Sequence, residues 1–482
     1  MAPPAAPRDA VAGTTAQQRR VLLVAILGTF VAFLDATVVT VALPAIGRDL
    51  GGTGEQALVL QQWVVDAYLV TLGALILVAG SLSDVHGRRR VLAAGLVGFA
   101  VASAACAVAP TGPFLVAGRA VQGVAGALLV PSSLAMIVSS FEGEAQGRAI
   151  GRWTAWTGMA GLLGPFVGGL LVDTLSWRWV FWLTVPVSVA TLLLLRGVPG
   201  GAPPGGRRID VRGAVLAAVG LAGTVSALIE SGRLGWTAWR VWLPLAVGVA
   251  CLVGFVLAER RAPDPMLPLR LFGARNFRWG NAATAAIYGA LGFGGFVVTL
   301  FLQQVAGYPA TLAGLAQLPV TLGMLTLSTR FGTLAGRYGP RLFMTVGPLV
   351  AACGFLLMLV TDARASYWTQ VFPGQVVFGL GLAVTVAPLT AAVLAAAPPA
   401  DAGIASAVNN AVARVAGLVV VALAGVIVAG TLDVATFHRA LVVTASLLAL
   451  GGLVSLAGIR AVAPRTPAPP AASRGEGAGA TG

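Results

Sequence analysis

The chain has 482 residues, of which 57% are hydrophobic and only 10% are charged, and its mean hydropathy is +0.88. A soluble globular protein of this length needs much more polar surface, so the composition excludes that class and indicates a polytopic membrane protein. The formal net charge of +14 is the balance of 31 arginines, with no lysine, against 17 acidic residues. Because the arginines lie beside apolar segments, they indicate membrane topology and not a nucleic-acid partner.

Windows of about 20 apolar residues, the length that crosses a bilayer, recur along the whole chain. The predicted spans are 21–46, 58–80, 91–109, 114–138, 149–173, 178–196, 213–231, 241–258, 279–303, 311–335, 342–361, 368–394, 403–430 and 439–460. Most arginines fall on one side of these spans, which predicts that both termini are cytoplasmic in a bacterial inner (plasma) membrane. Residues 1–20 and 461–482 are predicted to be disordered ends because they lack apolar content.

A compact charged turn separates the second and third spans. It reads Gly-Ser-Leu-Ser-Asp-Val-His-Gly-Arg-Arg-Arg over residues 80–90. A degenerate copy with the same Gly-to-Gly spacing, Gly332 to Gly339, follows the tenth span. This repeat predicts two six-helix halves, 21–196 and 279–460, with linkers and two inserted helices in residues 197–278.

Three more motifs lie inside spans. They are Leu34 to Ile46 in the first span, Gly118 to Gly126 in the fourth, and Gly164-Pro-Phe-Val-Gly-Gly169 in the fifth. Together with the turn at residues 80–90, they resemble the signatures of the fourteen-helix drug:proton antiporter branch of the major facilitator superfamily. Val85 and Ala160 depart from the family pattern, which usually has a basic residue and a glycine at those positions.

The resemblance implies an all-α membrane fold with two six-helix halves plus two inserted helices, fourteen transmembrane helices in all. It also implies proton-coupled efflux of hydrophobic or amphipathic drugs or secondary metabolites by alternating access. Two alternatives stay open: a carrier of the same fold for an ordinary metabolite, and a membrane receptor that does not transport.

Ionisable groups inside a bilayer are costly and therefore indicate function. Asp35 and Asp66 are the deepest carboxylates, and Arg119 lies in the fourth span. Arginine stays charged at accessible pH, so the carboxylates are the candidate proton carriers and Arg119 a candidate for modulating them. The alternatives are that Asp35 and Arg119 form a fixed structural pair, and that Asp66 lies near enough to the outer face to be hydrated.

Two motifs are candidates for conformational gating. The first motif is the charged turn at residues 80–90, which is expected to latch one conformational state of the transporter. Its candidate residues are Gly80, Asp84, Gly87, Arg88 and Arg89. The second motif is a helical face of small residues in the fifth span, where the proline allows a bend. Its candidate residues are Gly164, Pro165, Gly168 and Gly169. The alternatives are a topological anchor for the first motif and ordinary helix packing for the second.

The substrate site is expected near the midplane between the halves. Its candidate polar and aromatic residues are Trp153, Trp156, Tyr288, Gln303, Asn409 and Asn410. The sequence contains no P-loop and no cluster with metal-ligand spacing, so no enzyme activity and no cofactor besides the coupling proton are expected. The expected partners are a small amphipathic substrate and the lipid bilayer, with the chain acting as a monomer.

Overall fold

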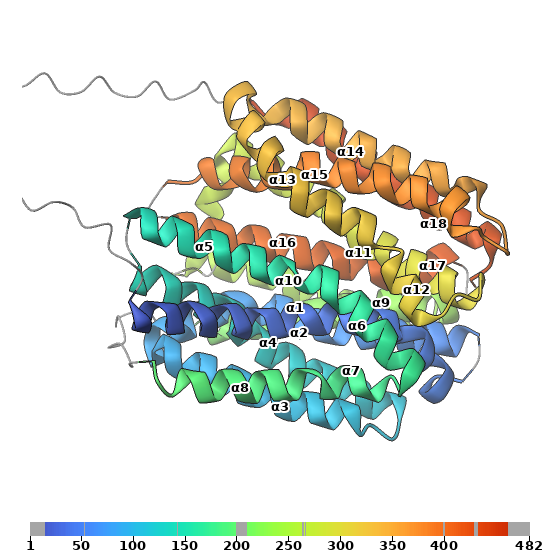
Figure 1. Cartoon of the computed structure of the whole chain (residues 1–482), viewed down its shortest axis with the longest axis horizontal. Coiled ribbons are helices and arrows are strands. Elements are labelled where there is room, and N and C mark those ends of the chain that lie inside the picture. Colours follow the sequence, from blue (N-terminus) through green and yellow to red (C-terminus); the bar gives the residue numbers. More distant parts are fainter. Residues whose placement is uncertain are drawn as a thin grey trace, which may run out of the picture.

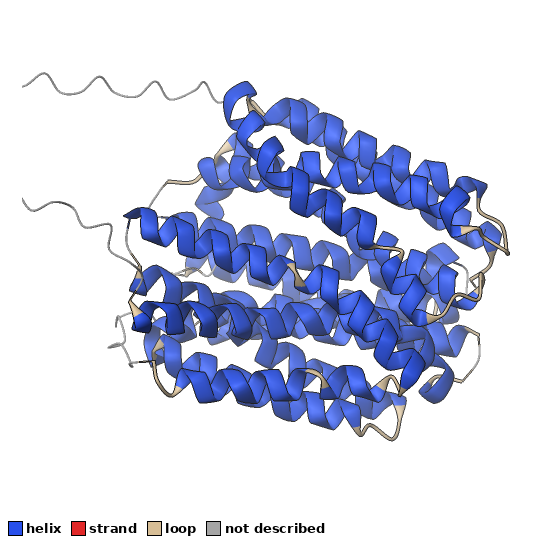
Figure 2. Cartoon of the chain, in the orientation of Figure 1, coloured by secondary structure: helices blue, strands red, loops and turns tan. Residues whose placement is uncertain are grey.

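The computed structural model describes residues 15–52, 54–141, 143–198, 210–262, 265, 267–398, 401–428 and 432–460. Every regular element among these residues is a helix (Figure 2). Fourteen helical segments are long and apolar enough to cross a bilayer, and they lie side by side along one direction (Figure 1). The predicted all-α membrane fold and its number of spans are therefore confirmed.

The predicted N-terminal half forms six spans. Its helices are α1 (Ala16–Leu50), α2 (Glu55–His86), α3 (Arg88–Ala107), α4 (Gly112–Ser140), α5 (Gly143–Gly158), α6 (Ala160–Thr174), α7 (Arg178–Trp182) and α8 (Thr184–Leu195). Helices α5 and α6 make one span that is interrupted at Met159, and α7 and α8 make one that is interrupted at Leu183.

The inserted pair and the predicted C-terminal half supply the other eight spans. Their helices are α9 (Val211–Leu234), α10 (Trp239–Arg261), α11 (Arg275–Gln304), α12 (Ala310–Leu315), α13 (Leu318–Tyr338), α14 (Pro340–Leu357), α15 (Phe372–Ala395), α16 (Ala402–Ala422), α17 (Ala424–Val428) and α18 (Val434–Gly458). Short 3-10 turns lie at Leu269–Gly273 and Met358–Val360, and a π turn at Tyr367–Val371 leads into α15.

The first helix begins earlier than predicted. The Thr15 hydroxyl accepts a hydrogen bond from the Gln18 backbone N–H at 3.2 Å, and the Gln18 side chain accepts one from the Thr15 N–H at 3.0 Å. This reciprocal capping satisfies N–H groups that the helix end leaves without partners. Residues 16–20, predicted to be disordered, are therefore helical, whereas residues 1–14 and 461–482 lie outside the described part of the chain.

The charged turn is also shorter than predicted. Helix α2 continues through Gly80 to His86, the chain reverses at Gly87, and α3 begins at Arg88. Gly87 has φ +90°, a conformation that side chains with a Cβ rarely adopt. The second copy of the motif has the same backbone geometry. Gly339, with φ +86°, separates α13 from α14.

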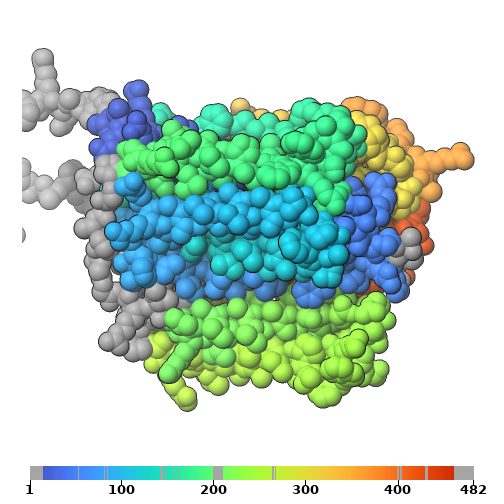
Figure 3. Space-filling view, turned by 90° about the horizontal axis from the view of Figure 1, so that it is seen from below, coloured from blue at the N-terminus to red at the C-terminus, as the bar shows by residue number. Residues whose placement is uncertain are grey.

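The inserted pair lies along the seam between the two predicted halves. Helices α9 and α10 pack closely on each other, and α9 also contacts α2, α16 and α17. Seen from below, the yellow-green surface of this pair lies beside the blue N-terminal helices (Figure 3). A helix from each half, α2 and α16, is therefore covered by the same insertion.

Candidate functional site

A buried ion pair lies in the interior of the N-terminal half. Arg119 of α4 donates from Nη1 to the Asp35 carboxylate of α1 at 2.5 Å, and the two side chains are 2% and 0% exposed. Arg119 Nε also donates to the Val64 carbonyl of α2 at 2.9 Å. The sequence predicted both charged residues as a functional set, and the structure brings them into direct contact.

Gln122 extends this pair into a network. Its amide oxygen accepts from Arg119 Nη1 at 2.6 Å, and its Nε2 donates to the second Asp35 oxygen at 2.8 Å and to Ser103 Oγ at 2.8 Å. Thr184 of α8 donates to the same Ser103 hydroxyl at 3.0 Å. The network therefore joins α1, α3, α4 and α8, and each Asp35 oxygen has a donor.

The sequence analysis did not single out Gln122, Ser103 or Thr184. A signal was available for Gln122, because positions i and i+3 lie on one helix face and Gln122 follows Arg119 at that spacing. The other two residues are short neutral side chains on separate helices. Only the packing of those helices shows that they belong to the network.

Aromatic rings complete the surroundings of Arg119. Its guanidinium carbon lies 4.4 Å from the centre of the Tyr68 ring and 5.9 Å from that of Phe181. Tyr68 is itself held by a hydrogen bond from its hydroxyl to the Ala32 carbonyl at 3.3 Å. Cation–π contacts of this kind stabilise a charge that has been removed from water.

Asp66 has very different surroundings. Its side chain is completely buried in α2, and neither carboxylate oxygen has a hydrogen-bond partner among the described residues. The alternative that Asp66 is hydrated near the outer face is therefore not what this structure shows. An unpaired charge in such a place costs much free energy, which distinguishes the surroundings of Asp66 from those of the paired Asp35.

The residues of the charged turn lie at the end of the bundle where α1 begins. Arg89 donates to the Arg196 carbonyl after α8 at 3.4 Å, and the Arg88 Nε is buried without a partner. A methyl group placed on Gly80 would meet no described atom within 4 Å. The side chain of Asp84 lies outside the described ones, and its role as a latch stays a prediction.

The glycine motif of the fifth span packs α6 closely against two other helices. A Cβ on Gly168 would lie 3.0 Å from Val38 Cγ1 of α1, and one on Gly164 would lie 2.8 Å from the Cβ of Thr37. Gly169 faces the backbone of α12 in the other half. Pro165 has no N–H for the Gly161 carbonyl, which instead accepts from the Thr321 hydroxyl of α13 at 3.5 Å.

Contacts between the halves gather at the end of the bundle opposite the charged turns. The Asp173 carboxylate at the end of α6 accepts from the N–H groups of Ala310 and Thr311 at 3.0 and 2.7 Å, and from the Thr311 hydroxyl at 2.6 Å. Gln62 Nε2 donates to the Val421 and Ala422 carbonyls, each at 3.0 Å. Figure 1 shows α6 and α12 meeting at this end, on the right of the view.

The candidate substrate residues are not all free to meet a ligand. Gln303 donates to the Val41 carbonyl at 3.0 Å, Trp153 donates to the Thr29 hydroxyl at 3.1 Å, and Asn409 donates to Asn281 and Thr284. Three others remain accessible to different degrees. Trp156 is 53% exposed, Asn410 is exposed, and Tyr288 is half-buried.

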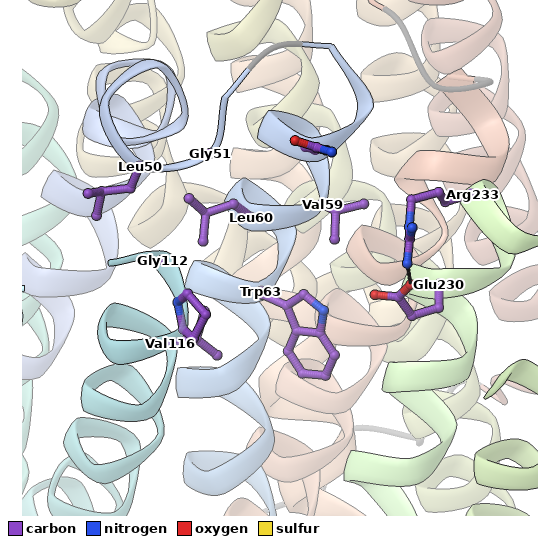
Figure 4. A pocket seen from close by; sticks show the side chains of 11 residues that line it. Leu50, Gly51, Val59, Leu60, Trp63, Gly112, Val116, Glu230 and Arg233 are labelled. Atoms are coloured by element: carbon purple, nitrogen blue, oxygen red, sulfur yellow. Dashed lines mark hydrogen bonds and ion pairs between the residues drawn. The ribbon is translucent and has the colours of Figure 1, made fainter. Parts of the chain in front are cut away.

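A pocket of about 450 Å³ opens at the same end as the contacts between the halves (Figure 4). Leu60 and Trp63 of α2 line it together with Val116 of α4. Glu230 and Arg233 of α9 form an ion pair at 2.8 Å on its other side. The pocket lies between the N-terminal half and the inserted pair, and neither Asp35 nor Arg119 lines it.

The sequence matches a known family over most of its length. The model of the Major Facilitator Superfamily matches residues 25–421. The chain belongs to this superfamily. The resemblance predicted from its motifs is therefore confirmed at the level of the family.

Relatives of the chain within the superfamily are resistance and export proteins. A puromycin resistance protein of Streptomyces alboniger is 36% identical over 415 residues, which cover 85% of this chain and 81% of that protein. A multidrug resistance protein of Mycobacterium tuberculosis is 34% identical over 414 residues, covering 84% and 75%. A cephamycin export protein of Amycolatopsis lactamdurans is 34% identical over 395 residues, covering 81% and 80%.

Solved structures agree on the fold. A D-xylose-proton symporter superposes with a TM-score of 0.70 at 17% identity, covering 94% of this chain and all of that one. At this identity the likeness concerns the fold alone. The protein is accordingly a multi-pass membrane transporter of the major facilitator fold, similar in sequence to drug and antibiotic exporters.

Proposed function

We propose that this protein exports hydrophobic or amphipathic small molecules across the plasma membrane in exchange for protons, with both termini in the cytoplasm. The names of its relatives support export of drugs or secondary metabolites. The observation that carries the proposal is the contrast between two buried carboxyl groups. Asp35 accepts from two donors, the Arg119 guanidinium and the Gln122 amide, whereas neither Asp66 oxygen has a hydrogen-bond partner among the described residues.

This contrast provides a device for proton coupling. A carboxyl group that gains or loses a cationic neighbour or water as the halves move changes its affinity for a proton. In the conformation described, the halves meet at the end opposite the charged turns, and Asp66 is sealed from solvent. We propose that Asp66 holds its proton in this state and releases it when the halves rock, and that Arg119 modulates Asp35 in the same cycle.

The proposal is tested with inverted membrane vesicles that contain the wild type, Asp35→Asn or Asp66→Asn. Asp362→Asn is the matched control, because this carboxylate lies in an exposed loop. A pH gradient is imposed, and both uptake of a panel of amphipathic dyes and dissipation of the gradient are recorded.

We expect dye-dependent dissipation by the wild type and the control, and none by the two site variants. Dye uptake that continues unchanged in both site variants would remove these carboxyl groups from the coupling mechanism. Absence of any uptake by the wild type would contradict drug export. It would favour a carrier for an ordinary metabolite or a receptor that does not transport.

A further inference from the structure

A second intramembrane arginine lies between the halves. Arg414 is near the middle of α16, and its guanidinium carbon lies 5.0 Å from the centre of the Phe33 ring of α1. It is half-buried and makes no hydrogen bond or ion pair with any residue that the structure describes. Phe33 lies two residues before Asp35, so Arg414 packs against the helix that carries the buried network, on a different face of that helix.

The surroundings of Arg414 differ from those of Arg119. Both side chains are permanently charged, and both lie where a charge is costly unless it has partners. Arg119 has a carboxylate, an amide, a carbonyl and the Tyr68 ring, whereas Arg414 has one phenyl ring. A single aromatic face leaves the five N–H donors of Arg414 without acceptors.

No carboxylate among the described residues pairs with Arg414 in this conformation. The two Asp35 oxygens already accept from Arg119 and Gln122. Neither Asp66 oxygen has a hydrogen-bond partner among the described residues, so no such contact joins it to Arg414. Asp35, Arg119 and Arg414 together carry one formal positive charge.

The position of Arg414 on its helix directs it toward the interior. Other residues of α16, among them Val412, Val415 and Val419, line an apolar pocket of about 500 Å³ beside the inserted pair. Arg414 is not part of that lining and instead contacts α1 of the opposite half. Asn410, one helical turn away on the same face, is exposed. A ligand at this face would touch α1 and α16, and therefore both halves.

We infer that Arg414 binds an anionic group of the exported compound, so that the transport site selects organic acids and zwitterions with a carboxylate or similar group. The inference rests on the proposed export function and names its substrate class. Guanidinium and carboxylate match in geometry and form charge-assisted hydrogen bonds, which are stronger than neutral ones. Binding would satisfy the donors of Arg414 and neutralise the excess charge between the halves.

Export of an organic anion changes the charge that each transport cycle moves across the membrane. Exchange of one organic anion moving outward for one proton moving inward transfers two positive charges toward the cytoplasm per cycle. Exchange of a monovalent cation for a proton transfers none. Export of an acid by this protein should therefore be driven by the membrane potential as well as by the pH gradient.

The test uses two dyes with the same ring system, rhodamine B, which carries a free carboxylate, and its ethyl ester, which does not. Uptake of each is measured in inverted vesicles with Arg414→Gln, Arg414→Lys and the wild type. Arg330→Gln is the matched control, because Arg330 is an exposed arginine of α13. Size-exclusion chromatography of the solubilised proteins reports folding.

We expect the wild type and the control to prefer the acid. Arg414→Gln should lower acid uptake by about tenfold or more while ester uptake stays within about twofold, and Arg414→Lys should retain an intermediate preference. In inverted vesicles energised by respiration, whose interior is both acidic and at positive potential, collapse of the potential with valinomycin and potassium should slow acid uptake by the wild type, a measurement that needs no variant.

Several results would overturn the inference. An equal loss of acid and ester uptake in folded Arg414→Gln would assign Arg414 a structural role. Preference of the wild type for the ester, or acid uptake that ignores the potential, would contradict anion recognition while leaving the export function intact. Uptake of neither dye by the wild type would count against the export function, and the inference would fall with it.

Discussion

Replacement of Gly169 by alanine should shift the balance between the two conformations of the transporter. A Cβ at this position would lie 2.6 Å from the Ala310 carbonyl oxygen and 2.6 Å from the Thr311 nitrogen of α12. These are backbone atoms of the other half, so they cannot move aside as the end of a flexible side chain can. The clash exists only where α6 meets α12, at the end of the bundle opposite the charged turns.

The size of the effect follows from the cost of overpacking. Inserting a methyl group into a well-packed contact costs about 1–3 kcal/mol. Because this cost applies to one conformation alone, it changes the ratio of the two states by about 5- to 150-fold. Gly161→Ala is the matched control, since a Cβ there would meet nothing within 4 Å. Both variants gain the same intrinsic helix propensity from alanine.

Electron-paramagnetic-resonance distance measurements can record this shift. Spin labels at positions 152 and 337, both exposed, report the separation of α5 and α13 near the charged turns. The native cysteines Cys106, Cys251 and Cys353 are replaced by serine beforehand. Gly169→Ala should shift the distribution toward shorter distances, whereas Gly161→Ala should match the parent. Superimposable distributions for the two variants would refute the reasoning.

Three further changes have defined outcomes. Asp173→Ala removes three charge-assisted hydrogen bonds to Ala310 and Thr311, so the same spin-label pair should report a shift in the direction of Gly169→Ala, worth about 1.5–3 kcal/mol. Gln122→Leu leaves an Asp35 oxygen without its amide donor and should lower the unfolding free energy by about 1–3 kcal/mol, seen as a lower thermal midpoint in detergent. Asp66→Asn changes a side chain without partners, so the thermal midpoint should stay near that of the wild type while proton-coupled transport is lost.

The spans were predictable because the thickness of the bilayer fixes the length of apolar sequence that each helix needs. Their ends were less predictable. Hydropathy reports where a helix leaves the hydrocarbon and not where it stops, so α2 continues to His86 through polar residues placed in the predicted turn. Helix α1 likewise begins at Ala16 because Thr15 and Gln18 cap it, although the surrounding residues are not apolar.

The same limit governs the candidate site. A charged residue in an apolar span is visible in the sequence because its transfer into the membrane is costly, and this signal identified Asp35, Asp66 and Arg119. It carries no information on partners, which depend on how separate helices pack. Arg119 and Arg414 give identical signals, yet one donates to three acceptors within its half and the other lies between the halves without an acceptor among the described residues. Cost in the bilayer therefore identifies the candidates, and only the packing of separate helices decides which of them has a partner.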